Sequence, residues 1–172
     1  GDLLTMSSTA SIGAFTESGR RPDSIVIGPG LGRDERTIEA VEAILGMATE
    51  RGIPIVVDAD ALGALPRGKW PRGMTGVATP HEAEASRWLG EADPSEALSE
   101  CLEEDSTIVI TGPEDRLTGP GGRSASSRGG HPRMAVGGTG DLLAGAIGGL
   151  LAQGMSPWPA ARLGCALLRE AG

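Results

Sequence analysis

Residues 137–141, Gly-Gly-Thr-Gly-Asp, constrain this chain more than any other stretch, because they stand directly before a strongly helical run. Apolar residues recur after Asp141 at helical spacing, which predicts one buried helix face: Leu142, Leu143, Ala146, Ile147, Leu150 and Leu151. We expect this helix to end near Gly154, which can adopt the left-handed conformation of a C-terminal cap. The glycines therefore lie at a helix N-terminus, where backbone N–H groups lack intrahelical partners and the helix dipole is positive. A glycine also lets a phosphate approach the backbone closely, because it has no Cβ.

Asp141 stands where this loop becomes the helix. A carboxylate beside an anion-binding loop can take the proton from a hydroxyl group that attacks the phosphate. The alternative is that the glycines form only a tight turn and that Asp141 caps the helix. The stretch by itself leaves both interpretations open.

Composition and charge exclude several classes of protein. The chain has 172 residues, enough for one domain with a core, and its three Trp, one Phe and no Tyr require a core of small aliphatic side chains. A net charge of −8 disfavours nucleic acid and anionic membranes as partners. No apolar run is long enough to span a bilayer, and no signal peptide is evident. Cys101 and Cys165 match no metal or redox spacing, so we expect a reduced, cytoplasmic setting and no protein-built metal site.

Four short apolar segments alternate with helical ones, at residues 24–28, 53–58, 77–79 and 107–112. Each ends in Gly, Asp or a residue next to Pro, which is typical of strands buried on both faces in a mostly parallel α/β sheet. Helices are predicted at residues 38–48, 80–89, 97–102 and 157–171. Residues 113–133 are rich in turn formers and predict an antiparallel hairpin or a flexible flap, and residues 1–22 are weakly patterned.

Several polar residues follow the predicted strands, where the ligands of open α/β sheets bind. Asp58 ends the second strand. It is either a contact to the substrate or to a magnesium-bound water, or an ordinary loop acid. Asp60 is predicted to be the N-cap of the short helix that follows. His81 lies at a strand-to-helix turn as a site residue or a surface histidine, and Glu84 lies in the first helical turn, where the dipole favours acids.

Four motifs together are similar to those of the ADP- or ATP-dependent NAD(P)H-hydrate dehydratases of the ribokinase-like superfamily. They are Gly-Pro-Gly-Leu-Gly at 28–32, Asp-Ala-Asp-Ala-Leu at 58–62, Thr-Pro-His-Glu-Ala-Glu at 79–84 and Gly-Gly-Thr-Gly-Asp at 137–141. The resemblance runs from Ser24 to the C-terminus. It implies a ribokinase-like three-layer αβα sandwich with a mostly parallel sheet, as a single domain over residues 1–172 with its motifs in 23–172.

The resemblance implies a repair enzyme. The nucleotide phosphorylates the added ring hydroxyl of the S epimer of NADH or NADPH hydrate, phosphate then leaves, and the double bond is restored. Asp141 would be the catalytic base, Mg²⁺ would bridge the phosphates, and ADP or ATP would be the co-substrate. The positions that match substrate contacts are Gly32, Asp58, His81, Glu84 and Asp141. The positions that match nucleotide contacts are Thr111, Gly112, Pro113, Gly137, Gly138, Thr139 and Gly140. We also expect a homo-oligomer.

The chain departs from the family pattern in three places. Thr111 replaces a lysine, and Glu82-Ala83 replaces a Pro-Gly pair between His81 and Glu84. Only 23 residues precede Ser24, so we expect the N-terminal strands of the family to be short or missing. Two alternatives therefore stay open: another ribokinase-like kinase of the hydroxyethylthiazole or hydroxymethylpyrimidine type, or a truncated, non-catalytic nucleotide-binding domain.

Overall fold

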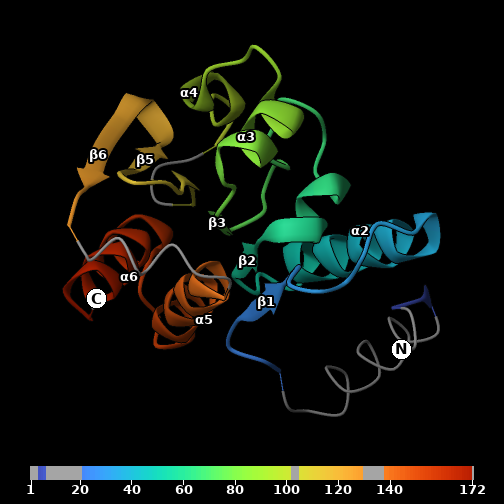
Figure 1. Cartoon of the computed structure of the whole chain (residues 1–172). Coiled ribbons are helices and arrows are strands. Elements are labelled where there is room, and N and C mark those ends of the chain that lie inside the picture. The colour runs from blue at the N-terminus through green and yellow to red at the C-terminus, as the bar shows by residue number, and fades with distance from the viewer. Residues whose placement is uncertain (1–3, 7–20, 102–104, 130–137, 172) are drawn as a thin grey trace.

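A computed structural model describes residues 4–6, 21–101, 105–129 and 138–171. These residues form a six-stranded sheet with helices on both faces (Figure 1). The strands are β1 (Ile25–Ile27), β2 (Ile55–Val57), β3 (Gly76–Ala78), β4 (Ser106–Ile110), β5 (Asp115–Gly119) and β6 (Arg123–Ser127). The helices are α2 (Glu35–Glu50), α3 (Glu82–Leu89), α4 (Pro94–Ala97), α5 (Thr139–Ala152) and α6 (Pro157–Ala171), with 3-10 turns η1 (Ala59–Ala64) and η2 (Pro120–Gly122).

The six strands lie side by side in chain order. β1 to β4 are parallel, and β5 and β6 add an antiparallel hairpin at one edge. The predicted mostly parallel sheet is therefore confirmed. The turn-rich segment after β4 forms the hairpin rather than a flap.

Side chains of the strands alternate between two cores, one on each face of the sheet. In β2, Ile55 and Val57 belong to the core under α2, η1 and α3, whereas Val56 belongs to the core under α5 and α6. β4 repeats the pattern, with Ile108 on the first face and Val109 on the second. This period of two, with helices over both faces, is the predicted three-layer sandwich (Figure 1).

Small residues let α5 and α6 pack closely. A Cβ on Gly164 would lie 2.7 Å from Cγ1 of Ile147, so a larger residue would push the two helices apart. On the other side of α5, Gly148 lies against Val26 of β1, where a Cβ would come within 2.3 Å of a valine methyl carbon. Both glycines are therefore required by close approach.

Three sequence predictions about the elements are wrong. β1 is not buried on both faces, since Val26 is 41% exposed. β1 lies at the edge of the sheet, and the residue of α5 that packs on Val26 is Gly148, which has no side chain to cover it. Leu142 is 66% exposed, because the face of α5 that meets the sheet is centred on Leu143 and Ile147. The helix predicted through residue 102 is limited to α4, which ends where Leu98 leaves helical geometry and enters the core, and residue 102 lies outside the described residues.

α5 ends at Ala152, and Gly154 adopts the left-handed conformation two residues later, close to the predicted end. No helix in the described part of the chain has the length and apolarity needed to cross a membrane.

Candidate active site at the carboxyl edge of the sheet

Backbone hydrogen bonds hold the loops that follow the parallel strands side by side. The N–H of Asp58 donates to Ile27 O (3.0 Å), that of Thr79 to Val57 O (3.1 Å) and that of Thr111 to Pro80 O (2.9 Å). Gly28 has φ +137°, and a Cβ there would lie 1.7 Å from the carbonyl oxygen of Asp58, so only glycine fits. The carboxyl ends of β1 to β4 therefore present their polar residues along a single edge.

Asp58, at 5% exposure, is the most buried of the residues predicted to contact the substrate. Its Oδ1 accepts a hydrogen bond from Thr79 Oγ1 at 2.9 Å. Burial raises the pKa of Asp58 above its ordinary value; hydrogen bonds from Thr79 and the Ala59 N–H oppose the shift, and the negative charges of Glu84 and Asp141 reinforce it. The structure thus brings together three carboxylates that were predicted separately.

Asp141 is the third residue of α5 and is solvent-exposed. The N-cap of α5 is Gly138, with a left-handed φ of +94°, and among the described residues no side chain caps this helix. The alternative in which Asp141 caps the helix is therefore wrong. Gly140 has no described atom within 4 Å of the position that a Cβ would occupy, and Gly137 lies outside the described residues. Among the described residues, the start of α5 leaves its backbone N–H groups uncapped by side chains, which suits an anion, and Asp141 lies beside it.

His81 and Glu84 form a reciprocal cap at the start of α3. His81 Nδ1 accepts from the N–H groups of Ala83 (3.1 Å) and Glu84 (3.3 Å), and a Glu84 carboxylate oxygen accepts from the His81 N–H at 3.0 Å. The cap uses the N–H groups of residues 83 and 84 but not that of Glu82. The cap does not use the N–H of residue 82, so it forms equally well with proline or with glutamate at this position. The replacement of the family's proline by Glu82 therefore leaves these hydrogen bonds intact.

Asp60 does not cap η1, contrary to prediction. η1 begins at Ala59, so Asp60 lies inside it, and its carboxylate reaches the preceding loop. Oδ2 accepts from the Gly32 N–H at 3.0 Å, and Oδ1 accepts from Arg33 Nε at 2.9 Å. The acid of the second motif thus fixes the glycine of the first motif, which was predicted to contact the substrate.

The predicted nucleotide loop after β4 is held by a buried ion pair. The Gly112 N–H donates to Asp115 Oδ1 at 3.2 Å, and its carbonyl accepts from Arg169 Nη2 at 2.6 Å. Arg169 also donates to both carboxylate oxygens of Asp115, at 2.7 and 3.0 Å. Asp115 and Arg169 were not found in the sequence, because they lie 54 residues apart and neither belongs to a motif. Contact of Thr111, Gly112 and Pro113 with a nucleotide stays a prediction.

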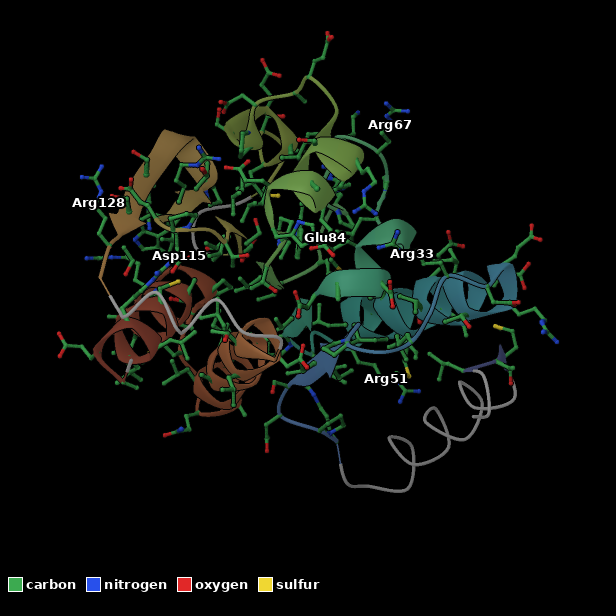
Figure 2. The ribbon with its side chains drawn as sticks, in the orientation of Figure 1. Arg33, Arg51, Arg67, Glu84, Asp115 and Arg128 are labelled. Carbon is green, nitrogen blue, oxygen red and sulfur yellow. The ribbon has the colours of Figure 1, made fainter. Side chains whose placement is uncertain are left out.

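A pocket of about 350 Å³ adjoins the carboxylates between α2, η1 and α3. It is lined by Arg33, Ile38, Ala59, Asp60, Leu62, Gly63, Leu65, Arg67, Glu84, Arg87 and Trp88. Asp60 and Glu84 belong both to this pocket and to the motifs. Arg33, in the loop before α2, and Arg67, in the loop after η1, line the pocket together with Glu84 of α3 (Figure 2). Sequence analysis missed the arginines, since a charged residue in a loop or on an exposed helix face carries no functional signal by itself.

Residues 3–172 match the sequence model of the family described as NAD(P)H-hydrate dehydratase. The chain belongs to the NAD(P)H-hydrate dehydratase family. The family predicted from the four motifs is thereby confirmed.

Named members of the family resemble the chain over most of its length. A bifunctional NAD(P)H-hydrate repair enzyme of Moorella thermoacetica is 37% identical over 162 residues, which is 87% of this chain and 30% of that protein. An ADP-dependent (S)-NAD(P)H-hydrate dehydratase of Xanthomonas campestris is 34% identical over 157 residues, covering 87% of this chain and 53% of the relative. The chain thus spans about a third to a half of the length of these dehydratases.

The fold agrees with that of a solved dehydratase. The ADP/ATP-dependent NAD(P)H-hydrate dehydratase of Bacillus subtilis, co-crystallized with ATP/Mg²⁺, is 29% identical, with a TM-score of 0.68 over 86% of this chain and 54% of that one. The predicted ribokinase-like architecture is confirmed.

Proposed function

We propose that this chain is a nucleotide-dependent dehydratase that repairs the S epimer of NADH or NADPH hydrate, with ADP or ATP as phosphoryl donor. One observation carries the proposal: Asp141, in the first turn of α5, is close enough to the buried Asp58 for its charge to act on that carboxyl, as the charge of Glu84 also does. A buried carboxyl group with a raised pKa, next to further acids at the start of a helix, favours phosphoryl transfer over a purely structural role. Membership of the family supports the choice of substrate.

The chemistry needs a base and a phosphate cradle. Hydroxide leaves a ring carbon poorly, whereas phosphate leaves well. Asp141 accepts the proton of the ring hydroxyl while the hydroxyl oxygen forms a bond to the terminal phosphorus of the nucleotide. The bond between that phosphorus and the nucleotide breaks, and the nucleotide leaves with one phosphate fewer. The new phosphate ester then breaks at its carbon–oxygen bond while the neighbouring carbon loses a proton, which restores the double bond.

The first turn of α5 supplies the cradle. The backbone N–H of Gly140 belongs to the first turn of α5, where helix amides have no acceptor within the helix, and it would stabilise charge on the transferring phosphoryl group. Gly140 leaves space for that group.

The carboxylates also suit Mg²⁺, which neutralises phosphate charge when bound. Nucleotide enzymes usually bind Mg²⁺ through one or two carboxylates, waters and substrate phosphates. Asp58 is the residue that would hold it, through a water.

The test is Asp141→Asn, which keeps the shape of the side chain and removes the base. We expect turnover of NADPH hydrate to fall about 10²–10⁴-fold, the typical share of a general base, with ATP affinity by calorimetry close to wild type. Glu170→Gln is the matched control, since it removes one exposed carboxylate at the far end of α6. Turnover in Asp141→Asn equal to that of the control would rule out this base.

A further inference from the structure

The pocket between η1 and α3 combines an apolar floor with a cationic rim. Ile38, Leu62, Leu65 and the buried Trp88 form the floor. Arg33, Arg67 and Arg87 come from three different segments, are exposed and line the pocket at its rim. Three arginines at one pocket are notable in a chain with 15 basic and 23 acidic residues.

The pocket holds three arginines, Arg33, Arg67 and Arg87, but only two acids, Asp60 and Glu84. Asp60 is paired with Arg33, whereas the Glu84 carboxylate accepts the His81 N–H. Arg87 Nε donates to the Ala83 carbonyl of its own helix at 3.1 Å. Among the residues that the structure describes, no carboxylate pairs with Arg67 or Arg87. The rim therefore has an excess of positive charge with free donors.

This chemistry matches a planar ring that carries phosphate. Guanidinium groups bind phosphate oxygens through paired N–H donors, and an apolar floor with an indole accepts a flat base. A volume of about 350 Å³ suits one such group rather than a macromolecule.

The pocket also lies where a substrate held by the carboxylates would extend. Glu84 lines the pocket and is one of the acids that act electrostatically on Asp58, as Asp141 does. Asp60 lines it as well and holds Gly32. We propose that the pocket binds the phosphate-bearing adenosine arm of the dinucleotide substrate, with Arg67 and Arg87 on the phosphates. This inference rests on the proposed function and extends it to substrate selection.

The first experiment separates this arm from the reacting ring. The double variant Arg67→Gln/Arg87→Gln is compared with wild type on NADPH hydrate and on the hydrate of reduced nicotinamide mononucleotide, which lacks the adenosine arm. We expect the KM for NADPH hydrate to rise about 10–100-fold, the equivalent of one or two charge-assisted hydrogen bonds. kcat, the KM for ATP and the KM for the mononucleotide hydrate should stay unchanged.

Arg36→Gln/Arg72→Gln is the matched control, because both arginines are exposed and lie outside the pocket. If Arg67→Gln/Arg87→Gln leaves the KM for NADPH hydrate unchanged, or raises the KM for the mononucleotide hydrate equally, the inference about the pocket is overturned. The proposed function is judged separately, by whether the wild-type chain turns over NADPH hydrate. A rise confined to the KM for ATP would assign the pocket to the co-substrate and also overturn it.

A second readout does not need turnover. Titration of the chain with ADP-ribose by calorimetry should give binding that is lost in Arg67→Gln/Arg87→Gln and kept in Asp141→Asn. If this pattern of ADP-ribose binding were found while the wild-type chain did not turn over NADPH hydrate, the assignment of the pocket would be supported and the proposed function would be contradicted. Absence of ADP-ribose binding at millimolar concentration would overturn the pocket even in an active enzyme.

Discussion

Asp58 and Asp115 lie at the same edge of the sheet and are almost equally buried, at 5% and 4% exposure, but they have opposite surroundings. Asp115 binds the Arg169 guanidinium with both oxygens and also accepts the Gly112 N–H. Asp58 has a threonine hydroxyl and a backbone N–H as partners, and its charged neighbours are Glu84 and Asp141.

The difference separates a structural carboxylate from a functional one. A buried charge costs free energy unless a partner compensates it, and Asp115 has that partner inside the chain. Through Arg169 it joins the loop after β4 to α6 and to Gly129 at the end of the hairpin. Asp58 has no cation among the residues that surround it in the described structure, which is the arrangement expected of a group that meets a cation or substrate from outside.

The largest effect should come from breaking the structural pair. Arg169→Met keeps an aliphatic stem but leaves Asp115 buried and unpaired. We expect a loss of about 3–5 kcal/mol in the free energy of unfolding, measured by urea denaturation.

A second substitution, Asp115→Leu in the Arg169→Met background, should recover much of this loss, because no uncompensated charge then remains. A loss below about 1 kcal/mol in Arg169→Met would show that the pair is not structural.

On the functional side, a change at Gly140 should lower affinity rather than stability. Gly140→Val meets no atom of the described residues near its Cβ but adds a branched side chain at the start of α5. We expect ATP affinity by calorimetry to fall at least about tenfold, or roughly 1.4 kcal/mol. Gly145→Val is the control, because it lies in the same helix, is exposed and is equally open. Equal ATP affinity in both variants would remove the phosphate cradle from the account.

The smallest effect concerns Asp58→Asn, which should lower turnover without lowering stability. The pKa of Asp58 is raised in the folded state above its ordinary value of 3.8, so the folded protein binds this proton more tightly than the unfolded chain. Protonation of Asp58 therefore stabilises the protein at low pH, and this stabilisation is lost as the pH rises through the folded-state pKa. Asparagine removes that dependence and can still accept from Thr79. We therefore expect the free energy of unfolding at neutral pH to equal or exceed that of wild type by up to about 1 kcal/mol.

Urea titrations at acidic and neutral pH check this sign, since the advantage of the asparagine variant should grow as pH rises. A variant that is clearly less stable than wild type at neutral pH would place Asp58 with Asp115 among the structural acids.

Local signals predicted most of the fold. Apolar runs such as residues 107–110 became strands, and the glycine of residue 138 adopts a conformation that other residues avoid. The motifs also selected Asp58, Glu84 and Asp141, which the folded chain brings together.

Features that depend on tertiary pairing could not be predicted. Nothing in the sequence joins Asp60 to Arg33 or Asp115 to Arg169, because each pair forms only after loops or helices have packed. The exposure of Val26 follows from the position of β1 at the sheet edge rather than from its apolar neighbours.

The most direct measurement mixes the chain with NADPH hydrate, Mg²⁺ and either ATP or ADP, and follows the absorbance of the intact dihydronicotinamide ring. The account predicts that absorbance returns only when nucleotide is present and not with Asp141→Asn. No recovery with either nucleotide, or recovery that needs no nucleotide, would contradict it.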